Sequence, residues 1–239
     1  MLAAASVDKT IRFWDTRANG RAEQVLSMRD CEEGALSMSW APNGHTLAVG
    51  TRDDRLVLID ARRASVDARR AAQLSTIVQP YEMNQIAWAP TGPAAGLLFV
   101  SAGSKTESDT YTGRVDVMAL AGGGEGGSGG ANKGNLVPVT SLVGHNAQIH
   151  SLAFDRSGTV FTTGSADSTI VVWSVEDMAP LRCFDRLEYA PKSLSFSYDG
   201  AYLASASDDR IVDVVRGRLP ISARATPAQR EGRPNAQHA

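Results

Sequence analysis

The sequence contains two residue patterns that could bind a metal ion or a phosphate group. His145 and His150 lie five residues apart, but no third metal ligand lies near them. This favours a core position for His145 and an exposed strand position for His150. The run "GGGEGG" at 122–127 matches G-x-G-x-x-G, yet no helix is expected behind it to hold a phosphate. No Ser, His and Asp set matches a catalytic motif, so we expect no metal, no cofactor and no catalytic residue.

The segment "DARRASVDARR" at 60–70 is the one local basic cluster. Within it, Arg62, Arg63 and Ser65 belong to "RRAS", which resembles a site for a basic-directed kinase. A solvated loop, a weak contact with phosphate and a regulatory site all remain open for this segment. The formal net charge is only −2. The overall charge therefore does not indicate attraction to nucleic acid or to an anionic membrane.

Two motifs recur along the chain and must position these residues. One is a turn-like Asp ahead of a strand-like run, found at Asp8, Asp53, Asp167 and Asp209. The other is an alternating apolar stretch that ends at an aromatic residue and a glycine-containing turn, with the aromatic residue at Trp40, Trp88, Phe154 and Phe196. A period of about 40–45 residues with four short strands per repeat is typical of β-propeller blades.

We therefore predict an all-β fold, a partial or open propeller of about five four-stranded blades over residues 1–215. The first blade starts part-way through its repeat, and the last lacks an outer strand. The third carries a Gly-rich insertion at about 121–135, and a tail at 216–239, rich in Arg, Pro and Ala, is expected to be disordered. Uncovered blade faces are expected to promote association of the isolated chain.

The stretch from Gly144 to Ser174 resembles a full WD40 repeat, with the Gly-His opening, Asp turn and Trp close of that family. WD40 blades hold a buried tetrad of a His, a Ser or Thr, an Asp and a Trp. The resemblance gives these roles to His145, Thr163, Asp167 and Trp173.

The other repeats depart from this pattern. Ile59 and Val215 stand where a Trp would follow Asp53 and Asp209, and Asp8 has no Gly-His partner. We expect these blades to rely on apolar packing.

A closer resemblance covers about residues 6–215. The runs "DKTIRFWDTR" and "NQIAWAP", and the stretch around "LRCFDRLEY", are similar to the THO complex subunit 3 family, the WD40 members of the nuclear THO/TREX assembly. That family forms a seven-bladed ring, of which this chain resembles about five blades. The resemblance implies a non-catalytic nuclear scaffold that supports mRNA processing and export through protein contacts and reaches RNA at most indirectly. The alternative is a general WD40 adaptor in another complex, such as a ubiquitin ligase or a signalling scaffold.

The composition is that of a globular protein. Hydrophobic residues make up 43% and charged residues 21% of the chain. No apolar run approaches the ~20 residues that span a bilayer, and the first residues do not resemble a signal peptide. Cys31 and Cys183 have no metal-ligand spacing, and we expect two buried thiols in a reducing compartment.

Overall fold

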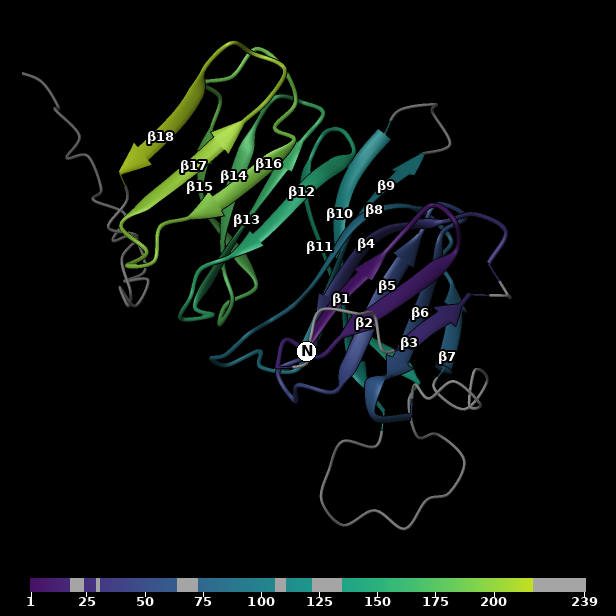
Figure 1. The fold of residues 1–239 in the computed structure, drawn as a ribbon. Helices are drawn as coiled ribbons and strands as arrows, with labels where there is room; N and C mark the ends of the chain where they lie inside the picture. Colours follow the sequence, from purple (N-terminus) through teal and green to yellow (C-terminus); the bar gives the residue numbers. More distant parts are fainter. Residues whose placement is uncertain (18–23, 29–30, 64–72, 106–110, 122–134, 217–239) are drawn as a thin grey trace, which may run out of the picture.

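The computed structural model describes residues 1–17, 24–28, 31–63, 73–105, 111–121 and 135–216, and it confirms the all-β class (Figure 1). Its strands form five antiparallel sheets that follow one another along the chain, which we call the first to fifth blades. One short 3-10 turn, η1 (Ala61–Arg63), is the helical exception in this part of the chain. The residues of the Gly-rich insertion at 122–134 and of the tail at 217–239 lie outside the described residues.

The blades have three or four strands each. In the second, third and fourth blades four strands pair in sequence order, and in the first and fifth three strands are described. The first blade contains β1 (Leu2–Ala5), β2 (Thr10–Trp14) and β3 (Gln24–Ser27). The second contains β4 (Ala35–Trp40), β5 (Thr46–Thr51), β6 (Arg55–Asp60) and β7 (Gln73–Val78).

The remaining blades continue the series. The third contains β8 (Glu82–Trp88), β9 (Leu97–Lys105), β10 (Tyr111–Leu120) and β11 (Leu136–His145). The fourth contains β12 (Ile149–Phe154), β13 (Val160–Ser165), β14 (Ile170–Ser174) and β15 (Ala179–Phe184). The fifth contains β16 (Ser193–Phe196), β17 (Tyr202–Ala206) and β18 (Val212–Arg216). We call β4, β8, β12 and β16 the inner strands, because each contacts the next in the series.

Every inner strand ends at the aromatic residue that the sequence predicts, and a turn with a left-handed glycine follows. At Gly158 the backbone has φ 66°, a conformation that glycine adopts without steric cost. A Cβ at this position would lie 2.2 Å from the carbonyl oxygen of Thr91, in the equivalent turn of the third blade. The glycine therefore allows two neighbouring turns to pack backbone against backbone.

Each blade packs its two faces against different neighbours, because successive side chains of a strand point to opposite faces. On β5 of the second blade, Leu47 and Val49 pack toward the first blade, whereas Ala48 packs toward the third. We call the face toward the preceding blade upstream and the face toward the following blade downstream. The downstream face of the second blade also contains Leu56 and Leu58, which pack with Ile86 and Trp88 of β8.

Side chains of the inner strands also join neighbouring blades by hydrogen bonds. A side-chain oxygen on one inner strand accepts a backbone N–H from the next inner strand, so each blade fixes the register of its neighbour. These bonds join Ile86 N–H to Ser37 Oγ (3.2 Å), Trp88 N–H to Ser39 Oγ (3.0 Å) and Leu152 N–H to Gln85 Oε1 (2.8 Å).

The series of blades is open. Figure 1 shows the purple first blade and the yellow fifth blade at the two ends of the series, with the other blades between them. No strand pairing joins these two blades in the described ranges. The outward faces of both carry exposed apolar side chains, including Leu2 and Val25 on the first and Val212 and Val214 on the fifth.

Candidate functional site

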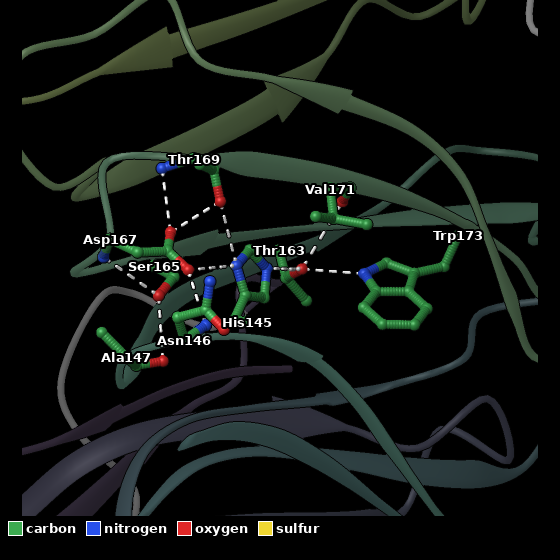
Figure 2. Close-up of polar contacts among 9 residues, drawn as sticks. All are labelled: His145, Asn146, Ala147, Thr163, Ser165, Asp167, Thr169, Val171 and Trp173. Atoms are coloured by element: carbon green, nitrogen blue, oxygen red, sulfur yellow. Dashed lines mark hydrogen bonds and ion pairs between the residues drawn. The ribbon is translucent and has the colours of Figure 1, made fainter. Parts of the chain in front are cut away.

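The structure brings together the four side chains to which the WD40 resemblance gave a joint role (Figure 2). His145, at the end of β11, places its Nε2 2.7 Å from Thr163 Oγ1 on β13. The indole N–H of Trp173, on β14, donates to the same hydroxyl at 2.8 Å. On the other side of the ring, His145 Nδ1 lies 3.2 Å from Asp167 Oδ2. The four groups thus connect the outer strand of the third blade to two strands of the fourth.

One arrangement of hydrogen atoms satisfies this whole series of hydrogen bonds. Trp173 donates to Thr163, whose hydroxyl donates to His145 Nε2, and His145 Nδ1–H donates to the carboxylate of Asp167. This arrangement requires a neutral imidazole. Burial lowers the pKa of His145, and the negative charge of Asp167 offsets this only in part.

Asp167 is ionised in the same network. Burial acts to raise the pKa of the carboxyl group, but hydrogen bonds from Thr169 and from the Asn146 backbone N–H outweigh burial and leave this pKa below its ordinary value. The Oδ1 atom accepts the Thr169 hydroxyl at 2.6 Å and the Thr169 N–H at 3.0 Å. The Oδ2 atom accepts the Asn146 N–H at 2.9 Å.

The glycine before His145 has a packing role. Gly144 lies against the indole of Trp173, and a Cβ at this position would lie 2.6 Å from its Cη2 atom. Trp173 is fully buried and stacks on Phe161 with ring centroids 5.8 Å apart. A residue larger than glycine at 144 would push the indole away from Thr163. The "GH" pair therefore places the imidazole and leaves space for the indole.

Two of the repeated Asp residues, Asp8 and Asp167, cap the turn that follows them. Asp8 accepts the hydroxyl (2.6 Å) and the N–H (3.0 Å) of Thr10, as Asp167 does with Thr169. The residue after the Asp is left-handed in both turns, with φ 62° at Lys9 and 64° at Ser168. The hydroxyl partners were not part of the sequence prediction, although the repeated D-x-T spacing was a signal for them.

The carboxylate has a further role in three of the blades that sequence reasoning missed. It accepts a backbone N–H from the loop that leads into the inner strand of the same blade, as Asp167 does with Asn146. The equivalent bonds run from Glu32 N–H to Asp53 (2.9 Å) and from Tyr189 N–H to Asp209 (3.5 Å). Asp8 instead lies 3.3 Å from the Arg12 guanidinium, on the surface. The Asp therefore joins two loops at one end of a blade.

The other sequence candidates are not part of this network. His150 lies on β12, where burial and then the charge of Lys192 lower its pKa. Among the described residues, no group of three His, Cys, Asp or Glu side chains could hold a metal ion, and no helix is long and apolar enough to cross a membrane. Cys31 is buried, but the prediction that Cys183 is buried is wrong. Cys183 lies on the outer strand β15, whose side chains are largely exposed.

The basic cluster is described only in part. Arg62 forms a two-bond ion pair with the buried carboxylate of Asp60, at 3.0 Å and 2.8 Å. The nearest ion-pair distance from Arg63 to this carboxylate is 3.7 Å. These two arginines therefore pair with the carboxylate at the end of β6. Ser65 and the rest of the cluster to residue 70 lie outside the described residues, as does the 122–127 glycine run.

Comparison with known proteins identifies the repeats. Residues 136–174 and 188–214 match the family model of the WD domain, G-beta repeat. The β-propeller domain of Cps50 (Swd1) from Myceliophteria thermophila has a similar fold, with a TM-score of 0.67 at 13% identity, over 95% of this chain and 65% of that one. The chain therefore contains WD40 repeats and has an open β-propeller fold.

Among individual proteins, the chain resembles THO complex subunit 3 of Arabidopsis thaliana. The two are 32% identical over 214 residues, which cover 90% of this chain and 57% of the relative. Protein HIR1 of Mycosarcoma maydis is 36% identical over 224 residues, but the match covers 17% of that protein. The mitotic checkpoint protein bub-3 of Caenorhabditis elegans is 25% identical, over 87% of this chain and 55% of the relative. The chain thus spans little more than half of the THO subunit.

Proposed function

We propose that this chain is a non-catalytic scaffold subunit of a THO-like complex in the nucleus. It supports mRNA processing and export by binding other protein subunits, and any contact with RNA is made through them. The observation that carries this proposal is the similarity to THO complex subunit 3 over 90% of the chain. Fold alone does not select this function, because WD40 propellers serve many complexes.

The hydrogen bonds of the repeats support a scaffold rather than an enzyme. A catalytic acid or base has to reach the proton that it moves. Both ring nitrogens of His145 are bonded to other side chains of the network. The carboxylates of Asp53 and Asp167 accept hydrogen bonds from their own turns and from the loop that leads into the inner strand. These groups hold loops in place, and a loop held in place is a suitable surface for a protein partner.

The segment that joins β15 of the fourth blade to β16 of the fifth offers one such surface. Its backbone is fixed by the bond from Ser168 Oγ to the Glu188 carbonyl (3.0 Å), and the buried side chain of Leu187 anchors it to the core. The side chain of Tyr189 is 55% exposed beside these anchors. An exposed aromatic ring on a fixed backbone is a typical binding hot spot. We assign Tyr189 to the partner-binding surface.

Affinity capture from nuclear extract, followed by quantitative mass spectrometry, tests this proposal. The tagged full chain should recover other subunits of the THO complex, and a fluorescent fusion should be nuclear. Tyr189→Ala should lower the recovery about tenfold or more, the effect of a hot-spot residue that contributes about 1.4 kcal/mol or more. The matched control is Tyr198→Ala, which removes an exposed ring at the opposite end of β16.

The alternative function is that of an adaptor in a different complex. The similarity to HIR1 and bub-3 favours this alternative, because both are similar to most of the chain. Recovery of one other multiprotein complex, with no THO subunit in it, would overturn the THO proposal and support the adaptor. Equal recovery with Tyr189→Ala and Tyr198→Ala would remove Tyr189 from the binding surface without deciding between the complexes.

A further inference from the structure

The second blade shows how this chain holds an added β-strand. The inner strand β8 lies on the downstream face of the second blade, where Ile86 and Trp88 donate their N–H groups to Ser37 and Ser39. The side chains of Ile86 and Trp88 are buried in the cluster that contains Ala48, Leu56 and Leu58 of the second blade. The two serine hydroxyls thus hold the backbone of β8, and the apolar surface beside them covers its side chains.

The fifth blade carries the same set of groups on its downstream face. Its inner strand has Ser193 and Ser195 three and one residues before the terminal aromatic, as Ser37 and Ser39 are placed before Trp40. The strand registers match as well. Trp40 pairs with Leu47 and Leu47 with Ile59, and in the fifth blade Phe196 pairs with Leu203 and Leu203 with Val215.

This register assigns an equivalent to each residue that supports β8. Ala204, Val212 and Val214 of the fifth blade stand where Ala48, Leu56 and Leu58 stand in the second. All three positions keep an apolar side chain, but in the fifth blade these side chains are more exposed to solvent than in the second. Leu56 and Leu58 are fully buried, whereas Val212 is 65% and Val214 53% exposed. Ser193 and Ser195 are exposed too, and Ser195 reaches only the adjacent Phe196 carbonyl, at 3.5 Å.

We propose that the downstream face of the fifth blade binds a β-strand of a partner protein in the way that the second blade binds β8. The face continues the series of blade interfaces already present in the chain. The partner strand presents two backbone N–H groups, two residues apart, to Ser193 and Ser195. Its side chains at these two positions are large and apolar, and they cover Val212 and Val214. This inference does not rest on the THO-like function.

A second copy of the chain is a poorer occupant for this face. A downstream face receives the inner strand of the next blade. In the described residues the first blade has no inner strand, because its sheet contains β1, β2 and β3 in that order. The inner strands of the other blades are already engaged within the chain. The described part of a second copy therefore offers no free inner strand with the required N–H groups.

A peptide titration with the purified full chain tests the proposal. The probe is a fluorescein-labelled peptide with the sequence of residues 81–89, which contains β8, extended by two lysines for solubility. Its fluorescence anisotropy should rise and saturate below about 1 mM, the weak range expected for a single short strand. A second peptide, N-methylated at the residues equivalent to Ile86 and Trp88, keeps the side chains but lacks both N–H donors. It should bind at least tenfold more weakly.

Variants of the chain locate the binding face. Val214→Glu should weaken binding at least tenfold, and the double variant Ser193→Ala, Ser195→Ala should weaken it several-fold. The matched control is Val139→Glu on β11, at a valine that is 54% exposed, and it should bind as the wild type does. Absence of saturable binding, equal binding of the N-methylated peptide, or equal losses in Val214→Glu and Val139→Glu would each overturn the proposal.

Two further outcomes identify other occupants. In a Cys183→Ser background, a Val214→Cys thiol should react rapidly with a maleimide. Protection of this thiol in the isolated chain would show that the chain's own residues cover the face. A dimer in light scattering that Val214→Glu dissociates would make a second copy the occupant. Either result would overturn the assignment to a partner strand.

Discussion

The fourth and fifth blades have matching positions 42 residues apart, from Asp167 to Asp209, but they bury their third strands to different extents. Every residue of β14 is buried, including Val172 and Trp173. In β18, Val215 alone is buried. The fourth blade packs between two blades, whereas the fifth packs on one side against the fourth in the described residues. Burial in this fold is therefore set by the neighbouring blades as much as by the strand's own sequence.

The polar networks of the two blades differ in the same direction. In the fourth blade, Asp167 accepts a 2.9 Å bond from the loop ahead of it, and His145 and Thr163 extend the network to an indole. In the fifth blade, the equivalent bond from Tyr189 to Asp209 is 3.5 Å long, and Val215 stands in place of the indole. The fourth blade should consequently be the more sensitive of the two to substitution.

The largest difference is expected at the Trp173 and Val215 pair. Trp173→Ala removes a fully buried ring that stacks on Phe161, and it should lower the free energy of unfolding by about 3–5 kcal/mol. Val215→Ala removes two methyl groups at a blade with one uncovered face and should cost clearly less. Urea unfolding followed by circular dichroism measures both. Equal losses would show that the two blades are equally well packed.

The next comparison concerns the tetrad role that we propose for His145, Thr163, Asp167 and Trp173. His145→Ala or Asp167→Ala leaves buried partners without a hydrogen bond and should cost roughly 1–3 kcal/mol. Asp8→Ala should cost less, because Asp8 is exposed and caps a turn with no histidine beside it. Equal denaturant midpoints for all three variants would contradict the tetrad assignment.

A smaller contrast is expected at Val172 and Val214, which are equivalent valines in β14 and β18. Val172→Thr buries a hydroxyl among apolar side chains and should cost about 1–2 kcal/mol. Val214→Thr places the hydroxyl in water and should change stability by less than about 0.5 kcal/mol. Thermal melts of the two variants provide the measurement. A substantial loss in Val214→Thr would mean that this face is covered in solution.

The smallest effect is a pH dependence that originates in two histidines, His145 at the end of the third blade and His150 on the fourth. Burial lowers the pKa of His145 and His150 below the unfolded-state value of about 6.5. Below that pH the unfolded chain binds protons that the folded chain does not, so the free energy of unfolding falls as the pH falls from about 7.5 to 5.5. His145→Asn should make this dependence shallower, and adding His150→Gln should make it shallower still. Identical pH slopes in the wild type and the double variant would refute this origin.

The sequence predicted the features that lie within one blade and recur from blade to blade. The aromatic ends of the inner strands and the turn Asp residues follow from strand patterning and turn chemistry, which are local. The four tetrad positions came from family resemblance, and the structure places them within hydrogen-bond distance.

Features that depend on two neighbouring blades could not be predicted from the sequence in this way. The bonds from Ile86 and Trp88 to Ser37 and Ser39 cross from one repeat to the next, and serine in a strand has no special signal. Cys183 was misjudged because cysteine is usually buried, whereas its position on the outer strand β15 exposes it. Burial of a strand residue depends on which strand of the blade it occupies, and residue type alone does not give this.

The hydrogen bonds between successive inner strands also bear on how the chain reaches its fold during synthesis. Each of these bonds joins a strand to one that was synthesised about one repeat earlier, such as Trp88 to Ser39 at a separation of 49 residues. At about 5–20 residues per second, a ribosome releases one repeat in a few seconds. Hairpins form in about 1–10 μs, so each blade can be complete before the next inner strand emerges. The finished face of one blade can then serve as the template on which the next is built, and assembly proceeds vectorially from the N-terminus.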